Sequence, residues 1–325
     1  MISELDQFCG ALKEHKSVLV MSHISPDADA AGSAAACSLA LGALGIHAVL
    51  HLPDPLSESL LGILRGIPFC AAFPDEQFDA VLCVDTADKK RVSCARPDIL
   101  DKGARSFNLD HHHSNGKWAD CNYVRPEAPA SAVLVHELFS SLQVPLDARA
   151  ANLLYAGLLD DTGCFCFSNA GTEAFSCALA LVSAGAVPQD IANMLYFSVP
   201  ERIFRLRAYA AGALRCVLGG RVAVIRLPLA ALKQCGAGPE DTEGLVDIAR
   251  SVSGVIAAVL MRELEPGLWK LSLRSKSPEL DVHQIASSFG GGGHKAAAGC
   301  RVQGSAEQVE EAVLAIVSAK LPAAR

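Results

Sequence analysis

The stretch His23-Ile24-Ser25-Pro26-Asp27-Ala28-Asp29 decides how the rest of this chain is interpreted. It follows an apolar run, residues 18–21, that has the length of a buried strand, and small residues from Ala30 onward then begin a helical pattern that ends near Gly45. One histidine and two carboxylates are therefore expected in a single loop between a strand and a helix. In open α/β sheets, the loops at the carboxyl ends of the strands are where ligands bind.

The two aspartates of this stretch are separated by one residue, so in an extended loop their side chains point the same way, and Pro26 stiffens the approach to them. Carboxylates that lie close together repel each other and raise each other's pKa unless a cation lies between them. Taken alone, the stretch is equally consistent with a polar turn that caps a helix.

The composition limits the class of protein. The chain has 325 residues, enough for two domains, and its 51% hydrophobic and 19% charged residues supply a substantial core. A net charge of −7 argues against a basic surface that grips duplex DNA. The twelve scattered cysteines and the polar start MISELDQFCG predict reduced thiols in a cytoplasmic protein without a signal peptide. We expect no membrane association, because no apolar run has the length of a membrane span.

In the first half of the chain, short apolar runs alternate with longer helical patterns, which is typical of βαβ units around a mostly parallel sheet. Two further apolar runs end in acids or imidazoles: residues 80–84 lead into Asp85-Thr86-Ala87-Asp88, and residues 106–109 lead into Asp110-His111-His112-His113. A helix cap or an exposed polar turn explains either segment by itself. Three successive strands that end in this way favour one shared site at one edge of the sheet.

A fourth acidic segment, Asp160-Asp161-Thr162-Gly163, ends a helix that Asp147 is predicted to cap. Two acids at the carboxyl end of a helix oppose its dipole, so a compensating cation is expected nearby. We expect Asp161 to be the acid that faces this cation, and we treat Asp160 as a solvated neighbour.

These segments together supply a mixed set of carboxylates and imidazoles without a thiolate. The candidates are His23, Asp27, Asp29, Asp85, Asp110, His111, His112 and Asp161. Such a set suits six-coordinate, hard divalent ions, with Mn²⁺ favoured and Mg²⁺ or Co²⁺ as alternatives. So many carboxylates indicate two ions that share a bridging aspartate and that activate water for phosphoester hydrolysis.

The same residues carry a resemblance. HISPDADAAGS, VDTAD, DHHHSN and LLDDTGCF match, in order, the four motifs of the DHH phosphoesterase superfamily, and SFGGGGHKAAAG resembles the signature of its DHH-associated C-terminal domain. The chain is most similar to the branch of nanoRNases and pAp phosphatases, the NrnA-type oligoribonucleases. The resemblance implies the following roles: His23 and Asp27 bind one metal ion, Asp29, His111 and Asp161 bind the other, Asp85 bridges them, Asp110 supports the site, and His112 contacts the scissile phosphate or assists proton transfer. It implies no role for His113.

The second half begins with a predicted helix from Pro188 to about residue 213 that links two domains. We expect a catalytic domain over residues 1–185, a helical linker over residues 186–213 and a substrate-binding domain over residues 214–325. Residues 202–226 contain six arginines and no acid. We interpret most of these arginines as a solvated face that pairs with acids elsewhere.

The run Gly290-Gly291-Gly292-Gly293-His294-Lys295 follows in this second half. We interpret the four glycines not as packing residues but as backbone N–H groups aimed at an anion near a helix N-terminus, although a flexible turn is the simpler alternative. With Arg274 at the end of a preceding strand, the run predicts a phosphate or nucleotide cradle. The resemblance implies that Arg274 and His294 contact substrate phosphate together with Gly291, Gly292 and Gly293, with Lys295 as a helper.

We therefore expect an α/β protein with a mostly parallel N-terminal sheet flanked by helices, a helical linker and a smaller C-terminal α/β domain, with the active site in the cleft between the domains. The resemblance implies Mn²⁺-dependent hydrolysis of short single-stranded RNA, of linear dinucleotides such as pGpG and pApA, and of 3′-phosphoadenosine 5′-phosphate (pAp). It leaves a homodimer open.

Two other functions are kept as alternatives. A RecJ-like exonuclease on longer single-stranded DNA is disfavoured by the chain length and the acidity. A non-catalytic nucleotide-binding module predicts substitutions among the metal ligands, and the sequence shows none.

Overall fold

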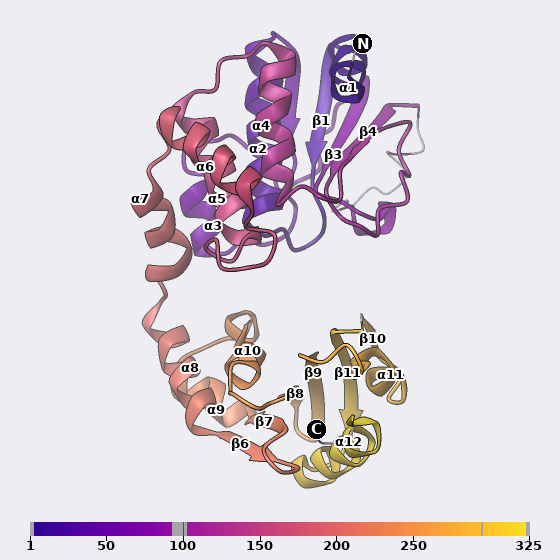
Figure 1. The fold of residues 1–325 in the computed structure, drawn as a ribbon, viewed down its shortest axis with the longest axis vertical. Coiled ribbons are helices and arrows are strands. Elements are labelled where there is room, and N and C mark those ends of the chain that lie inside the picture. Colours follow the sequence, from indigo (N-terminus) through magenta and orange to yellow (C-terminus); the bar gives the residue numbers. More distant parts are fainter. Residues whose placement is uncertain (1–2, 93–99, 101–102, 243, 294, 323–325) are drawn as a thin grey trace. The chain divides into compact units, whose positions relative to one another are not determined.

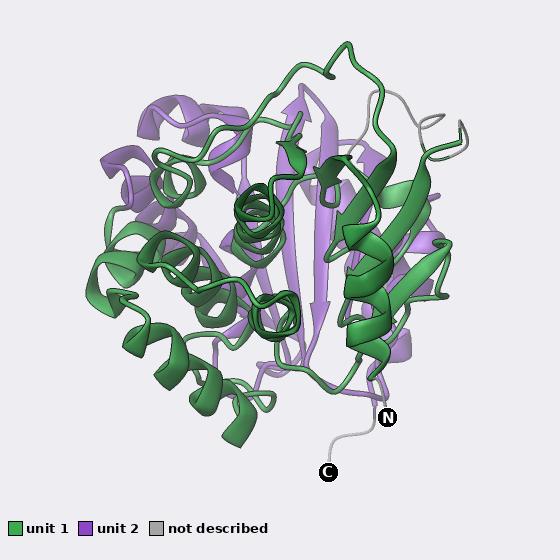
Figure 2. Cartoon of the chain, turned by 90° about the horizontal axis from the view of Figure 1, so that it is seen from above, with its two compact units in different colours: residues 1–198 green, residues 199–325 purple. Residues whose placement is uncertain are grey.

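The computed structural model describes residues 3–92, 100, 103–242, 244–293 and 295–322. The chain divides into two compact units, Met1–Ser198 and Val199–Arg325 (Figure 2). We describe each unit by itself. The domain limits near residues 185 and 213 stay a prediction.

The first unit is built on a five-stranded parallel sheet with the strand order β2-β1-β3-β4-β5. Figure 1 labels its strands β1, β3 and β4. The strands are β1 (Ser17–Met21), β2 (His47–Leu50), β3 (Ala80–Val84), β4 (Arg105–Asp110) and β5 (Cys121–Val124). The helical segments are α1 (Glu4–Lys13), α2 (Ala28–Ala43), α3 (Glu58–Ile63), η1 (Lys89–Arg91), α4 (Ser131–Leu142), α5 (Ala148–Asp161), α6 (Thr172–Ser183), α7 (Pro188–Ala192) and η3 (Asn193–Phe197). The predicted α/β class with a parallel sheet and flanking helices is confirmed.

The central strands of this sheet are buried on both faces, which explains why they read as continuous apolar runs. On β1, Val18 and Val20 belong to the large core that the helices cover, whereas Leu19 and Met21 belong to a smaller core on the opposite face. Val20 is paired with Leu82 of β3 in the parallel register.

Helices α2 and α5 approach each other closely because small residues line their contact. Gly32 of α2 lies against the backbone of α5, and a Cβ atom there would lie 2.5 Å from the carbonyl oxygen of Leu153. The run of alanines in α2 also favours the helix itself, since alanine has the highest helix propensity.

The second unit contains a six-stranded mixed sheet with the order β10-β11-β9-β8-β7-β6 (Figure 1). Its strands are β6 (Leu214–Val217), β7 (Val222–Leu227), β8 (Ala257–Glu265), β9 (Leu268–Ser275), β10 (Gly292–Gly293) and β11 (Ala297–Gln303). Its helical segments are α8 (Glu201–Gly212), α9 (Leu229–Cys235), η4 (Pro239–Thr242), α10 (Leu245–Arg250), α11 (Val282–Ser287) and α12 (Ala306–Lys320). Alternate residues of β7 face two separate cores, which is the pattern of a sheet covered on both faces.

The predicted single helix from Pro188 to about residue 213 is wrong. The chain forms α7, continues into the π-helical turn η3, leaves helical geometry at Ser198 and begins α8 only at Glu201. Pro200 explains the interruption, since proline has no N–H to donate and restricts the residue before it to extended geometry.

The arginines that follow this break pair with acids, as predicted for most of them. Arg202 lies 3.0 Å from Asp241, and both Arg215 and Arg226 donate to Glu310. These contacts all lie within the second unit.

The interpretation of the glycine run as a loop at a helix N-terminus is also wrong. The run follows the carboxyl end of α11, and Gly292–Gly293 form the edge strand β10, which pairs with Gly299 and Ala298 of β11. Two of the glycines have a packing reason, because a Cβ at Gly291 would overlap the Gly299 carbonyl oxygen and a Cβ at Gly293 would lie 2.6 Å from the Ala297 oxygen.

Within the described part of the chain, no single helix has the length and apolar character needed to cross a membrane. One bent pair, α6 with α7–η3, meets that test by length and composition when the two helices are taken together across a 113° bend.

The glycine run supplies a matched pair of substitutions. We expect Gly291→Ala to lower the free energy of unfolding of the second unit by about 1–3 kcal/mol, the range typical of overpacking. Gly292→Ala serves as the control, because a Cβ at Gly292 meets no atom within 4 Å. Thermal unfolding of the full chain measures both effects, and equal stability of the two variants would contradict the packing explanation.

Candidate metal centre

The candidate site lies at the carboxyl edge of the parallel sheet in the first unit. His23 follows β1, Asp85 follows β3, and Asp110 ends β4 with His111 directly after it. The strand β2 follows β1 in the chain but lies on its other side, so β1 and β3 are neighbours at the point where the strand order reverses. Loops diverge at such a point and leave room for a ligand.

Three overlapping groups of side chains there have potential metal-ligating atoms within 4.8 Å of one another. The groups are His23, Asp27 and Asp85; Asp29, His111 and Asp161; and Asp85, His111 and His112. The structure thus brings together all six residues that the sequence analysis names as metal ligands. Their assignment to particular ions stays a prediction.

Asp85 lies at the centre of these groups, and its two carboxylate oxygens face different partners. Oδ2 is 3.4 Å from Nε2 of His23, whereas Oδ1 is 3.5 Å from Nε2 of His111. The side chain is buried, and the residue has a left-handed backbone with φ of 56°. Such backbone strain is concentrated at functional sites, where the surrounding structure enforces it.

The two histidines next to Asp85 have the hydrogen-bond pattern of metal ligands. Nδ1 of His23 bonds to the carbonyl oxygen of Ile24 at 2.8 Å, and Nδ1 of His111 bonds to that of Ala128 at 3.1 Å. Each Nδ1 therefore carries a proton, and each Nε2 faces the carboxylates. Histidines that bind metals are usually oriented through their second nitrogen in this way.

The expectation that Asp27 and Asp29 project together from an extended loop is wrong. Helix α2 begins at Ala28, so Asp27 is its N-cap and Asp29 lies within the first turn. Oδ1 of Asp27 accepts the N–H of Ala30 at 2.9 Å, which confirms the capping interpretation of that residue. The two aspartates fall into different groups of potential ligands.

The fully buried Asp29 side chain is held by the start of another helix, α4. The backbone N–H groups of Ser131 and Ala132 donate to Oδ2 and Oδ1 of Asp29 at 2.6 and 2.9 Å. The positive end of the α4 dipole therefore stabilises the negative charge of Asp29.

A second set of polar contacts fixes His112. Its Nδ1 lies 2.7 Å from Oδ1 of the buried Asp110, and Asn115 donates its amide to Oδ2 of the same carboxylate. Asn115 also bonds to Asn108, whose amide donates to the Cys83 carbonyl oxygen. Asn115 stands within the DHHHSN stretch, but the sequence analysis gave it no function.

Asp161 and its neighbour have separate partners. Oδ2 of Asp161 is 3.0 Å from Nε2 of His111. Asp160 is more than a solvated neighbour, because it accepts the N–H of Ala28 at the start of α2 and the hydroxyl of Tyr196. Asp161 therefore belongs to a group of potential ligands, whereas Asp160 accepts a hydrogen bond from the N-terminus of a helix.

The protonation behaviour of these groups tests whether they fit a cation. Burial raises the pKa of Asp29 well above its ordinary value, and the charges of Asp161 and Asp85 raise it further. Burial lowers the pKa of His111, but its hydrogen bond with Asp161 and the charge of Asp29 outweigh burial and raise it to about 10. A proton on the imidazole of His111 thus offsets the negative charge of the crowded carboxylates, as a divalent cation does in a metalloprotein.

The residues therefore fit a divalent-metal centre. All donors are imidazoles or carboxylates, the histidines are oriented through backbone carbonyls, and the charge is balanced only when protons or cations are present. Oxygen and imidazole donors are those preferred by hard divalent ions.

The predicted substrate contacts belong to the second unit. Arg274 near the end of β9 is paired with Ala297 of β11, and Gly293 of β10 is paired with Ala298, so both lie at the same end of that sheet. The backbone carbonyl of Lys295 accepts the N–H of Val282 at the start of α11. His294 lies outside the described residues.

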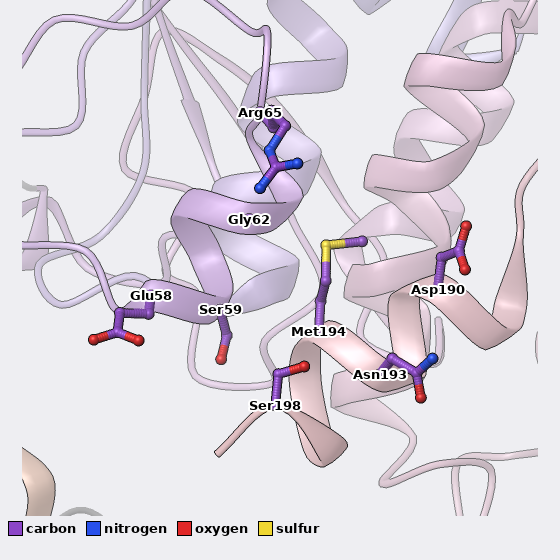
Figure 3. Close-up of a pocket in the computed structure, with 8 residues that line it drawn as sticks. All are labelled: Glu58, Ser59, Gly62, Arg65, Asp190, Asn193, Met194 and Ser198. Atoms are coloured by element: carbon purple, nitrogen blue, oxygen red, sulfur yellow. The ribbon is translucent and has the colours of Figure 1, made fainter. Parts of the chain in front are cut away.

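A cavity of about 500 Å³ occurs elsewhere in the first unit, between α3 and the α7–η3 segment (Figure 3). Glu58, Arg65, Asp190 and Met194 are among its lining residues, and Figure 3 shows the Met194 side chain pointing toward α3. None of its lining residues belongs to the candidate metal centre. We therefore place the chemistry at the sheet edge rather than in this cavity.

Comparison with known proteins identifies two domain families along the chain. The model of the DHH family N-terminal domain matches residues 17–158, and that of the DHHA1 domain matches residues 219–321. The "Bifunctional oligoribonuclease and PAP phosphatase NrnA" of Thermus thermophilus is 30% identical over 310 residues, which cover 94% of this chain and 90% of the relative. The chain belongs to the DHH family. It is therefore a phosphoesterase by family, as the sequence motifs predict.

One further relative and one solved structure are similar to this chain over most of its length. The protein of the same name from Bacillus subtilis is 25% identical and covers 89% of this chain and 90% of the relative. The crystal structure of an exopolyphosphatase-related protein from Bacteroides fragilis superimposes with a TM-score of 0.86 at 23% identity and covers 97% of both chains. The latter likeness shows that the two chains share one fold along their length.

The packing of the DHH domain around Asp29 leads to a first prediction for this site. A Cβ at Gly157 of α5 would lie 2.5 Å from Oδ1 and 2.9 Å from Cα of Asp29. We expect Gly157→Ala to lower the free energy of unfolding by about 1–3 kcal/mol through overpacking and to weaken Mn²⁺ binding.

Gly10→Ala is the matched control, because Gly10 lies within α1 and a Cβ there meets no atom within 4 Å. It is expected to raise stability by about 0.5–1 kcal/mol through helix propensity. Thermal unfolding in EDTA and calorimetric Mn²⁺ titration measure the two effects. Wild-type values for both in Gly157→Ala would refute the close-approach argument.

A second prediction concerns the release of a proton from His111 when Mn²⁺ binds. The pKa of about 10 for His111 means that this imidazole is protonated at pH 7.5 and must lose its proton to bind a cation. Mn²⁺ binding is therefore expected to release protons, and its affinity is expected to rise with pH until the pKa of His111 is passed. Titration calorimetry at pH 7.5 in two buffers with different ionisation enthalpies measures the release. Equal heats in both buffers, with an affinity independent of pH, would be the contrary result.

Proposed function

We propose that this DHH protein is a Mn²⁺-dependent phosphodiesterase and phosphatase that hydrolyses short oligoribonucleotides to mononucleotides and pAp to AMP. The observation that carries the proposal is the position of Asp85 between two groups of ligands. The names of the relatives from Thermus thermophilus and Bacillus subtilis, both oligoribonuclease and PAP phosphatase, support the choice of substrates. Linear dinucleotides such as pGpG and pApA belong to the same substrate class.

In this proposal the residues of the centre would hold two divalent ions. His23 and Asp27 would bind the first, Asp29, His111 and Asp161 would bind the second, and Asp85 would be shared, since its two oxygens face different histidines. Bound metal ions of this type lower the pKa of water and stabilise negative charge on a phosphoryl group. The chain's own contribution is to hold the carboxylates at close range, where protons or cations must balance them.

His112 is proposed to act on the phosphate or on the leaving oxygen. Its hydrogen bond to Asp110 raises its pKa above the ordinary histidine value, although burial opposes this effect. Since Asp110 occupies Nδ1, Nε2 is the nitrogen left to contact the substrate or donate a proton. Asp110 orients the ring as the carboxylate does in other acid–base pairs.

The second unit is proposed to bind the part of the substrate away from the cleaved bond, through Arg274, the backbone of Gly291, Gly292 and Gly293, and the His294-Lys295 pair. Arginine and backbone N–H groups both suit phosphate, although the N–H of Gly291 already donates to the carbonyl oxygen of Ala286 at 2.9 Å. We expect a preference for short substrates, in line with the oligoribonuclease names of the relatives.

The test is Mn²⁺-dependent release of phosphate and mononucleotides from pAp, from pGpG and from 5′-phosphorylated RNA of increasing length. We expect the shortest RNAs and pAp to be cleaved fastest. Asp85→Asn is expected to lower kcat by ~10³-fold or more, because several kcal/mol of charge stabilisation are lost.

Asp88→Asn is the matched control from the same VDTAD stretch. Asp88 is exposed and caps the short helix η1 through the N–H of Lys90, outside the groups of potential ligands. It is expected to keep wild-type turnover. Equal turnover of long and short chains would favour the RecJ-like alternative, and tight binding of dinucleotide without cleavage would favour a binding module.

A further inference from the structure

Ser131 contacts two carboxylates of the candidate metal centre at once. Its backbone N–H donates to Oδ2 of Asp29 at 2.6 Å, and its hydroxyl donates to Oδ1 of Asp85 at 2.9 Å. Ser131 is fully buried, and it is the first residue of α4. The contacts are therefore shielded from water. Hydrogen bonds to charged groups are stronger in the protein interior than in water.

The two carboxylates belong to different groups of potential ligands. Asp29 lies with His111 and Asp161, whereas Asp85 is shared by the other two groups. Ser131 thus connects one ligand of the second proposed metal position to the residue proposed to bridge both. The sequence does not predict this role for Ser131, because a serine at the start of a helix is normally interpreted as a cap.

The capping explanation does not account for the hydroxyl. The N-cap of α4 is Ala130, whose side chain makes no capping bond, and Ser131 directs its hydroxyl to Asp85 rather than to the backbone of its own helix. Asp29 instead accepts the N–H groups of the first two residues of α4, Ser131 and Ala132.

We propose that Ser131 is a positioning residue that fixes Asp85 relative to Asp29 and thereby couples the two metal positions. The inference rests on the proposed function. The start of α4 holds the contact between the Ser131 N–H and Asp29, and the Ser131 hydroxyl binds Oδ1 of Asp85. This second contact fixes the rotation of the Asp85 carboxylate. In this orientation Oδ2 faces His23 and Oδ1 faces His111. Without the hydroxyl, Asp85 is free to turn toward one position at the expense of the other.

The test compares Ser131→Ala with the matched variant Ser33→Ala. Ser33 is also fully buried and donates its hydroxyl to Asp29, at 3.2 Å, but belongs to α2 and makes that bond within its own helix. Ser131→Ala keeps both backbone donors to Asp29 and removes only the link to Asp85. Ser131→Thr restores the hydroxyl.

The first readout is titration calorimetry of Mn²⁺ into the metal-free protein. Ser131→Ala is expected to weaken one of two binding events by about 10–100-fold, the range for partners that orient metal ligands, whereas Ser33→Ala changes each by less than about 3-fold. The second readout is the electron paramagnetic resonance spectrum at two equivalents of Mn²⁺. The wild type and Ser33→Ala are expected to give the signal of a coupled ion pair, and Ser131→Ala that of isolated Mn²⁺.

The outcomes separate the possible failures. If the wild type binds fewer than two Mn²⁺ ions, the proposed function loses its two-metal basis. If the wild type binds two and Ser131→Ala binds both with unchanged affinity and spectrum, the inference about Ser131 is overturned while the proposed function stands. Thermal unfolding in EDTA checks each variant. If Ser131 only fills space, Ser131→Thr is expected to show no recovery of the coupled Mn²⁺ signal, because threonine adds a methyl group at a fully buried site.

Discussion

The mutual repulsion of four carboxylates is the constraint on which the first unit depends. Asp27, Asp29, Asp85 and Asp161 are gathered at one edge of a sheet, and two of them are almost completely buried. Carboxylates in such an environment become protonated unless opposite charge lies beside them. The structure supplies that charge in several forms: the imidazoles of His23 and His111, and the positive end of helix α4.

The parallel sheet makes this crowding geometrically simple. Each strand ends at the same edge, and each following loop starts there, so residues more than a hundred positions apart along the chain need no special path to meet. The reversal of strand order between β1 and β3 opens the space that their side chains occupy. Helix α5 adds the last member, Asp161, from its carboxyl end. The helix dipole there is unfavourable for an acid, so the contact with His111 compensates for it.

Much of the fold and of the site was predictable from the sequence because strand ends are marked by local chemistry. Apolar runs that end in Asp85 or in Asp110-His111-His112 identify both a strand and the edge where it stops. What could not be predicted depends on contacts between distant segments. The start of α2 at Ala28 and the second role of Asp160 depend on each other, since Asp160 accepts the N–H of Ala28. The prediction for the glycine run was wrong for the same reason, because β10 exists only through its pairing with β11, a strand that follows it in the chain.

Gly157 has a consequence for how this family varies. It binds nothing and carries no side chain, yet the space it leaves is filled by Asp29 itself. A position outside the groups of potential ligands therefore helps to set the shape of the candidate metal centre. Wherever helices α2 and α5 pack in this way, we expect drift at that position to be as restricted as at a ligand. A survey of sequence variation alone would not separate Gly157 from the potential ligands. Only the packing shows that it acts by leaving space for Asp29.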